Sequence, residues 1–321
     1  MRQDSRKVDV PDISRIQGYH AGGNFCNETY AFDGFVRNWY FNSDRKIPLN
    51  ANFQRADGQA LQGFGLEIET ECRGISNRSV LAEIMTKIIL TKFKFGADMW
   101  KLQSDASLGG DSSAEVISQV MTKSRIRNDY AAYKTMFNEY FPAMGISADS
   151  HRTHCGMHVN VSNACFGKTR EQQEQGIRKL YYIVNRHYDV FVRAFYRDPR
   201  KTEWCGAMDY SVAKTMSLIN ADGSHHNCMN LSHYRAGRIE IRLVGGQKDY
   251  YCFRNTMETV FHVVERCRSI SWADCDKLAA IFKGCNQYVY KRLSTECAGL
   301  IPSADMEIIR ENVKPEDLEL H

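Results

Sequence analysis

Carboxylates, histidines and arginines lie between apolar residues in four short segments. In residues 64–70, Glu67 and Glu69 alternate with Leu66 and Ile68. Because side chains alternate across a β-strand, this spacing predicts a strand with both glutamates on one face. The other three segments repeat the pattern: Glu115 in residues 113–118, His154, His158 and Asn160 in residues 154–162, and Arg238, Glu240 and Arg242 in residues 238–244.

A single sheet built from these strands would gather four glutamates, a histidine and arginines on one face. Two like charges about 4 Å apart repel by on the order of 4 kcal/mol at an effective dielectric constant near 20. Bound cations, ion pairs or raised pKa values relieve such repulsion. Carboxylate oxygens favour Mg²⁺ or Mn²⁺, and metal ions beside an arginine commonly serve phosphoryl transfer. The pattern therefore predicts a metal and phosphate site.

The segments around these strands indicate the fold class and the domain organisation. Strands separated by helices without regular alternation predict an α+β fold. We expect an irregular N-terminal segment in residues 1–60, a catalytic domain in residues 61–270, and a helical appendage in residues 271–321 with a loosely attached tail from Pro302. Apolar spacing predicts helices over residues 76–94, 128–144, 170–197, 250–268, 272–282 and 287–296, and further strands over residues 99–103 and 228–233.

Charge and cysteine usage narrow the class of partner. The net charge of +4, with basic residues scattered among acidic ones, argues against nucleic acid as the main partner. We find no signal peptide and no apolar run long enough to span a bilayer, so we expect a cytoplasmic protein without a membrane partner. The 11 cysteines contain no C-x-x-C pair and are expected to be reduced and mostly buried, although Cys155 and Cys72 lie near the candidate chemistry.

Five motifs in the sequence, taken in order, resemble those of the amidoligase family of the glutamine synthetase-like superfamily. The resemblance covers roughly residues 60–265. Residues 65–69 resemble the family's G-x-E-x-E opening, 105–108 its D-G-S-L loop, 115–118 its E-(I/V)-V-S strand, 155–161 its C-G-x-H-V-H-V strand, and 239–242, with Asn230 upstream, its E-F-R strand. Two positions depart from the pattern: Ala106 replaces a glycine, and Asn160 replaces the second histidine of H-V-H.

The resemblance implies a curved, mostly antiparallel sheet that half-encloses the active site, with helices on its outer face. It implies ATP and two or more Mg²⁺ ions, and an enzyme that joins a small-molecule or peptide carboxylate to an amine through an acyl phosphate. By carry-over, the metal ligands or their neighbours are Glu67, Glu69, Glu115, His158 and Glu240. Arg242 and Glu240 would act in catalysis, and Asp105, Ser107, Arg238 and Arg242 would bind the nucleotide.

The amine must lose a proton, and His154 and Asp209 are candidates for the base. Loops 105–112 and 199–225 are candidates for a lid that excludes water.

Three alternatives remain open at this point. A guanidino-kinase-like phosphotransferase would transfer phosphate and form no amide. A zinc hydrolase would use His151, His154 and His158, but strand geometry places His151 on the opposite face from the other two, and the sequence contains no H-E-x-x-H. A non-catalytic protein that binds nucleotide or a protein partner would explain the departures at Ala106 and Asn160.

Overall fold

The computed structural model describes residues 62–72, 100–103, 113–118, 120–143, 145–221, 224 and 226–314. An open antiparallel sheet of seven strands lies at its centre, in the order β2-β3-β1-β5-β7-β6, with β4 paired to β1. Its strands are β1 (Phe64–Cys72), β2 (Trp100–Gln103), β3 (Ser113–Ser118), β4 (Ile146–Ser147), β5 (Met157–Ser162), β6 (Met229–Asn230) and β7 (Arg238–Ile241).

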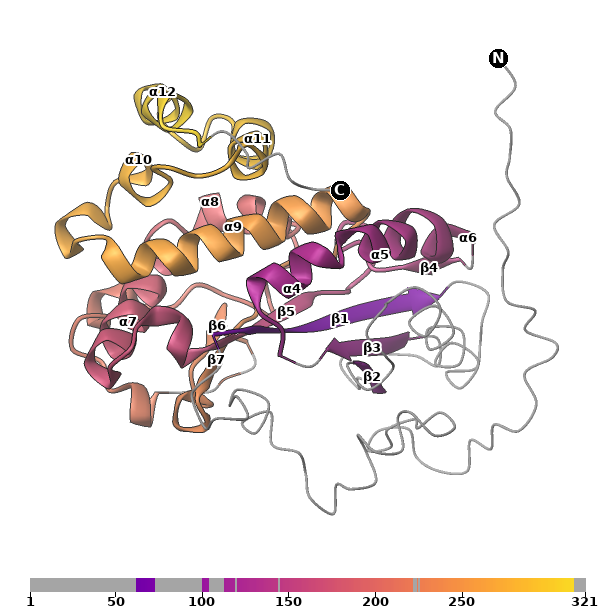
Figure 1. Ribbon diagram of the computed structural model, residues 1–321, viewed down its shortest axis with the longest axis horizontal. Helices are drawn as coiled ribbons and strands as arrows, with labels where there is room; N and C mark the ends of the chain where they lie inside the picture. Colours follow the sequence, from indigo (N-terminus) through magenta and orange to yellow (C-terminus); the bar gives the residue numbers. More distant parts are fainter. Residues whose placement is uncertain are drawn as a thin grey trace.

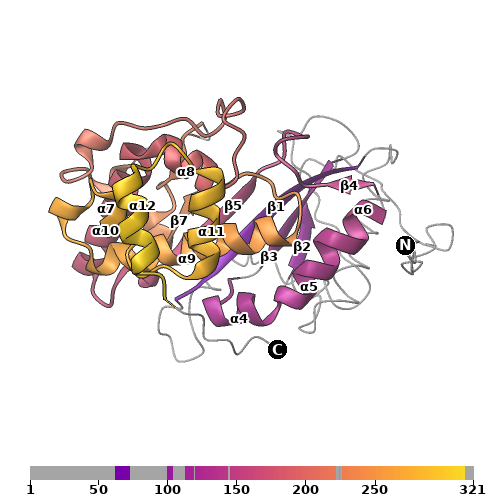
Figure 2. The same ribbon diagram turned by 90° about the horizontal axis from the view of Figure 1, so that it is seen from above.

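Helices pack on one face of this sheet. Figure 1 shows α9 (Tyr250–Ser269) lying across the sheet, with α10 (Leu278–Ile281), α11 (Gln287–Glu296) and α12 (Ser303–Glu311) beyond it. Figure 2 shows α4 (Lys123–Asn128), α5 (Tyr130–Thr135) and α6 (Phe141–Ala143) beside that group. The other helical elements are α7 (Arg170–Arg186), α8 (Tyr188–Ala194), the π-helix η6 (Met136–Tyr140), and the short 3₁₀ turns η7 (Asn163–Phe166), η8 (Tyr210–Val212), η9 (Leu218–Asn220), η10 (Tyr234–Ala236) and η11 (Trp272–Asp274).

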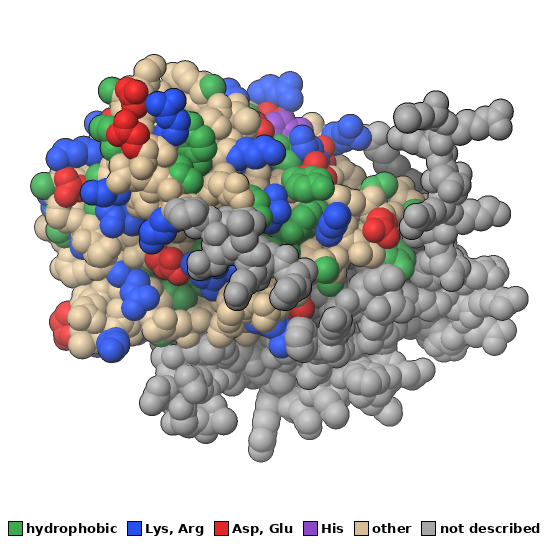
Figure 3. Space-filling view, turned by 45° about the horizontal axis from the view of Figure 1, so that its top comes forward, with side chains coloured by type: hydrophobic (Ala, Val, Ile, Leu, Met, Phe, Trp, Pro, Cys, Tyr) green, Lys and Arg blue, Asp and Glu red, His purple; other side chains and the backbone are tan. Residues whose placement is uncertain are grey.

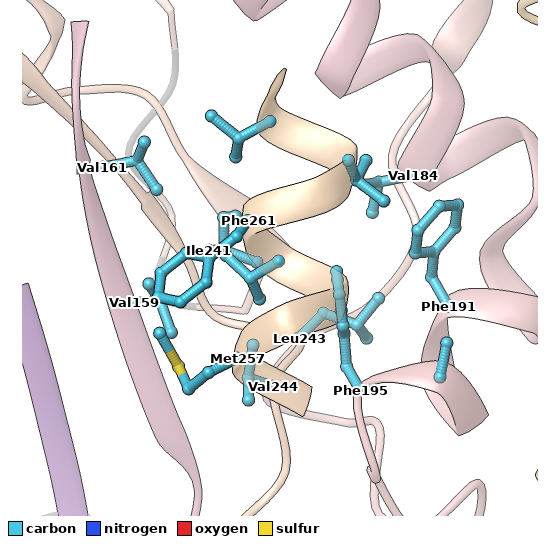
Figure 4. Packing of buried hydrophobic residues seen from close by; sticks show 14 of the residues in the cluster. Val159, Val161, Val184, Phe191, Phe195, Ile241, Leu243, Val244, Met257 and Phe261 are labelled. Atoms are coloured by element: carbon cyan, nitrogen blue, oxygen red, sulfur yellow. The ribbon is translucent and has the colours of Figure 1, made fainter. Parts of the chain in front are cut away.

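The apolar residues of β1, β5 and β7 face α9, and the polar residues of these strands lie on the opposite face. Leu66 and Ile68 of β1 are fully buried, as are Val159 and Ile241 on the neighbouring strands. Burial of such side chains stabilises the fold by roughly 1.5–3 kcal/mol each. Figure 4 shows Val159, Val161 and Ile241 against Met257 and Phe261 of α9, with Val184, Phe191 and Phe195 on the far side of that helix.

The predicted α+β class is confirmed at this level, and several element boundaries differ from the prediction. The helical segment expected over residues 128–144 already begins at Lys123, because Thr122 Oγ1 accepts a hydrogen bond from the Arg125 amide at 3.2 Å. The helix expected over residues 170–197 is divided at His187, whose Nε2 lies 3.0 Å from the Cys275 carbonyl oxygen. A local cap therefore sets the start of the first helix, whereas a contact distant in sequence lies at the break in the second.

The C-terminal region also differs from the prediction. Only η11 and α10 form within the helix expected over residues 272–282, whereas α11 has the predicted bounds. The tail expected to be loosely attached from Pro302 forms α12, and Ile309 of that helix is fully buried in the core. The predicted N-terminal segment 1–60, the helix 76–94 and the loop 105–112 lie outside the described residues.

The surface of the described part carries charged side chains of both signs. Figure 3 shows Lys and Arg side chains interspersed with Asp and Glu on the face drawn. Among the described residues, no helix combines the length and apolar character needed to cross a bilayer.

Candidate metal and phosphate site

Strand pairing brings the predicted site residues together across four adjacent strands. In the antiparallel ladders, Glu69 lies opposite Glu115, and Glu67 lies opposite His158. Asn160 lies opposite Glu240, which in turn lies opposite Asn230 of β6 on its other side. Because directly paired residues share a face of the sheet, all of these side chains lie on the face opposite α9. The sequence therefore predicted the members of this cluster.

His158 is the centre of the cluster. Its Nδ1 atom lies 3.3 Å from Glu67 Oε2 and 3.4 Å from Glu240 Oε1, and its Nε2 atom lies 3.6 Å from Glu69 Oε1. Burial by itself lowers the pKa of His158, but the hydrogen bond to Glu67 and the charge of Glu69 raise the pKa above its usual value. The imidazolium form is therefore favoured among these carboxylates when they hold no cation.

Glu67 is held in its ionised form. Burial raises the pKa of its carboxyl group, but the hydrogen bond and charge of His158, with the hydrogen bond from Asn160 and the charge of Arg238, lower that pKa to about 2. Asn160 Nδ2 donates to Glu67 Oε1 at 2.8 Å, and Asn160 Oδ1 accepts from Arg238 Nη1. Asn160 therefore orients both Glu67 and Arg238.

Glu240 and Arg242 form the second charged unit of the site. Arg242 Nη1 lies 2.7 Å from Glu240 Oε1, and Asn230 Nδ2 donates to Glu240 Oε2 at 3.0 Å. Both partners of the ion pair are largely buried, so the pair is weakly screened by solvent. The arrangement places a guanidinium at the edge of the carboxylate cluster, where it can contact an anionic ligand.

The donor set fits a divalent cation. One ligand atom each from Glu67, Glu115 and His158 lies within 4.8 Å of the other two. Glu69 and Glu240 both approach the same histidine ring. Several carboxylate oxygens with one imidazole favour Mg²⁺ or Mn²⁺ over a thiophilic metal.

Other predicted residues lie elsewhere. Asp105, Ser107 and the departure at Ala106 are outside the described residues. His151 and His154 are exposed and precede β5, which begins at Met157, so the described structure does not assemble the three-histidine zinc site.

Asp209, a candidate for the base, is also exposed and caps a 3₁₀ turn by accepting from the Ser211 amide at 2.8 Å. Both His154 and Asp209 therefore lie outside the carboxylate cluster.

Cys155 is a buried core thiol. Burial raises its pKa well above the ordinary value, so the thiolate needed for nucleophilic attack is disfavoured. The side chain of Cys72 is outside the described residues.

Gly156 permits a close approach that sequence reasoning did not anticipate. Its amide donates to Glu69 Oε2. A Cβ atom at this position would lie 2.9 Å from Arg197 Nη1 and 3.2 Å from Glu69 Oε2. A side chain at this position would therefore displace the guanidinium of Arg197 or the carboxylate of Glu69.

Arg197 reaches this place through an unusual helix end. The Arg197 amide donates to the Val192 carbonyl at 2.7 Å and the Tyr196 amide to the Arg193 carbonyl at 2.9 Å, the pattern of a Schellman motif after α8. Tyr196 occupies the left-handed position of the motif with φ of 58°, and is the one non-glycine residue in the described ranges with positive φ. That conformation costs a residue other than glycine roughly 1–2 kcal/mol. No motif in the sequence marks Arg197; a tyrosine where a helix-ending glycine is usual is visible only once α8 is known.

Comparison of the sequence with protein-family models and with curated proteins gives no match.

Proposed function

We propose that this protein is an ATP- and Mg²⁺-dependent carboxylate–amine ligase with the sheet of the glutamine synthetase-like superfamily. One observation carries the proposal: Glu67, Glu115 and His158 converge within 4.8 Å on a sheet face that also holds Glu69 and the Glu240–Arg242 pair. Buried carboxylates at this density favour a bound cation, and the neighbouring guanidinium favours a phosphate. The class of reaction is proposed from the five sequence motifs, whose order resembles that of the amidoligases.

The residues of the site suggest how the reaction would proceed. Bound Mg²⁺ would neutralise the phosphate charge of ATP. A carboxylate oxygen of the substrate attacks the γ-phosphorus, ADP leaves, and an acyl phosphate forms; an amine then displaces inorganic phosphate to give the amide. Arg242 is placed to stabilise negative charge on the transferred phosphoryl group. Asn160 holds Glu67 in orientation for the metal.

The position of Asn160 weakens the case for a non-catalytic protein. The asparagine keeps Glu67 and Arg238 in place. Its replacement of a histidine therefore leaves the carboxylate donors of the site intact, and the departure does not by itself remove metal binding.

Thermal unfolding with and without Mg²⁺ and ATP tests the binding step. A ligand present at about 100 times its dissociation constant stabilises the folded state by about 2.7 kcal/mol. We expect the melting temperature of the wild type to rise by several degrees only when both ligands are present. Glu240→Gln should lose this shift, whereas Glu139→Gln, a substitution of an exposed glutamate outside the cluster, should keep it. A wild type that does not respond to Mg²⁺ and ATP would refute the metal–nucleotide site.

Trapping with hydroxylamine tests the reaction class. The protein is incubated with ATP, Mg²⁺, hydroxylamine and a pool of small carboxylates, and hydroxamate and ADP are measured. Because hydroxylamine captures acyl phosphates, a ligase forms both products and the Glu240→Gln variant forms neither. A phosphotransferase of the guanidino-kinase kind would release ADP with phosphorylated product and no hydroxamate.

A further inference from the structure

Beside the carboxylate cluster lies a pocket that the proposed chemistry does not yet use. Its lining includes Arg197, Lys201, His154, Glu203 and Trp204. Arginine and lysine contribute two fixed positive charges to this lining, and Glu203 contributes one negative charge. The balance favours an anionic group as the occupant.

Arg197 is the residue that points to a ligand. Its side chain is only 6% exposed, yet it lines the pocket. Its Nε atom donates to the Lys201 carbonyl at 3.0 Å, and its two terminal nitrogens donate to no residue in the described ranges. The terminal nitrogens therefore remain available to an acceptor in the pocket, and the planar fork of a guanidinium matches a carboxylate in two parallel hydrogen bonds.

The neighbours of Arg197 hold it rigidly and next to the reactive face. Lys201 Nζ donates to the carbonyl oxygens of Ser150 at 3.0 Å and Thr153 at 2.6 Å, which fixes the segment after Arg197. The position that a Cβ of Gly156 would take lies 2.9 Å from Arg197 Nη1 and 3.6 Å from His158 Nε2. An anion bound to Arg197 would therefore lie close to the carboxylate cluster without occupying it.

We propose that Arg197 forms an oxyanion subsite that binds a carboxylate group of the acid substrate beside the metal and phosphate site. The identity of this occupant rests on the proposed ligase function. A phosphate group of the nucleotide shares the same chemistry, and the two sources are separated by the choice of probe. The substrate class is accordingly an acid that reaches from Arg197 to the carboxylate cluster.

Trp204 provides a signal for a direct binding test, because it is 47% exposed and lines the pocket. Succinate and, separately, inorganic phosphate are titrated while tryptophan fluorescence is followed, with a chelator present and without nucleotide. Omitting metal and nucleotide makes the result independent of the metal–nucleotide test. Trp204→Phe should lose the signal, which identifies the reporter among the 4 tryptophans.

We expect a saturable change with succinate in the wild type and in the control Glu139→Gln. Arg197→Gln should weaken succinate binding by about tenfold or more, and Arg197→Lys by less, because lysine keeps the charge but loses the fork. Melting curves of both variants verify that they are folded. If Arg197→Gln does not fold, the comparison of Arg197→Lys with the wild type decides the test. The subsite is refuted if succinate gives no saturable change, or if both Arg197 variants bind succinate as tightly as the wild type does. Tighter Arg197-dependent binding of phosphate than of succinate would assign the pocket to the nucleotide and overturn the carboxylate proposal.

Discussion

Glu69 of β1 and Glu115 of β3 lie directly opposite each other in the antiparallel ladder, and their exposed fractions are only 5% and 9%. Like charges in this relationship destabilise a sheet unless another group offsets them. His158 lies 3.6 Å from Glu69 Oε1 and shares a possible metal group with Glu115. His158 is placed to offset part of this repulsion, and in the proposed function a bound divalent cation would add to that effect.

Replacing Glu115 should stabilise the metal-free protein but weaken the stabilisation that Mg²⁺ provides. We expect Glu115→Gln to raise the free energy of unfolding by about 0.5 kcal/mol in a chelator, because it removes a like-charge contact across the strands. The same variant should lose most of the stabilisation by Mg²⁺, because it replaces a charged metal ligand with a neutral amide. Urea unfolding with chelator and with Mg²⁺ measures both effects, with Glu139→Gln as the control. A variant that Mg²⁺ stabilises as strongly as the wild type would exclude Glu115 from the metal site.

Asn160 should be important for stability as well as for the site. Asn160→Ala removes the acceptor of Arg238 and a donor to Glu67, and Arg238 is buried with its Nε atom already lacking a partner in the described structure. Loss of hydrogen bonds to buried charged groups is expected to cost about 2–3 kcal/mol in the free energy of unfolding. Asn220→Ala, on the exposed surface, should change it by less than about 0.5 kcal/mol. Equal effects of the two substitutions in urea unfolding would contradict the positioning role.

Gly156→Ala tests the close approach of Arg197 to the cluster. The added Cβ would lie 2.9 Å from Arg197 Nη1, so the guanidinium must move; because it is the end of a flexible side chain, we expect a cost of about 1 kcal/mol, at the low end of overpacking effects. At Gly206 the nearest atom would be 3.6 Å away, so Gly206→Ala should cost much less. Thermal unfolding compares the two variants. Similar melting temperatures for both would show that Arg197 does not occupy the described position.

The pair formed by His158 and Glu67 predicts a particular dependence of stability on pH. The raised pKa of His158 means that its contribution is present below the unfolded-state pKa and is lost as pH rises through the folded-state pKa. The lowered pKa of Glu67 means that its contribution is present above the unfolded-state value and is lost as pH falls towards about 2. The pair therefore stabilises the metal-free protein between these two pKa values.

Urea unfolding in a chelator measures this window. The difference in unfolding free energy between the wild type and His158→Gln should be larger near pH 6 than near pH 9, since the unperturbed pKa of histidine is about 6.5. His154→Gln, which removes an exposed imidazole outside the cluster, is the matched control. The same difference at both pH values would show that the imidazolium form is not favoured in the folded state.

The strands were the most predictable part of the fold, because their signal is local. Alternation of Leu66 and Ile68 with Glu67 and Glu69 requires only neighbouring residues, and the segment forms β1 as predicted. The helix boundaries were less predictable. His187 divides α7 from α8 through a contact with the Cys275 carbonyl, which is 88 residues away along the chain. Spacing within a helix carries no information about such a partner.

The sequence by itself determined which side chains share a face within each strand, because the two-residue period of a strand depends only on backbone geometry. It thereby identified Glu67, Glu69, Glu115, His158 and Glu240 as candidates. Only the tertiary structure decided that β3, β1, β5 and β7 are adjacent in a register that sets Glu69 opposite Glu115 and Glu67 opposite His158. The same is true of Arg197, which lies after a helix and reaches the cluster across Gly156. Strand order and such approaches depend on contacts between distant segments, for which the sequence pattern holds no period.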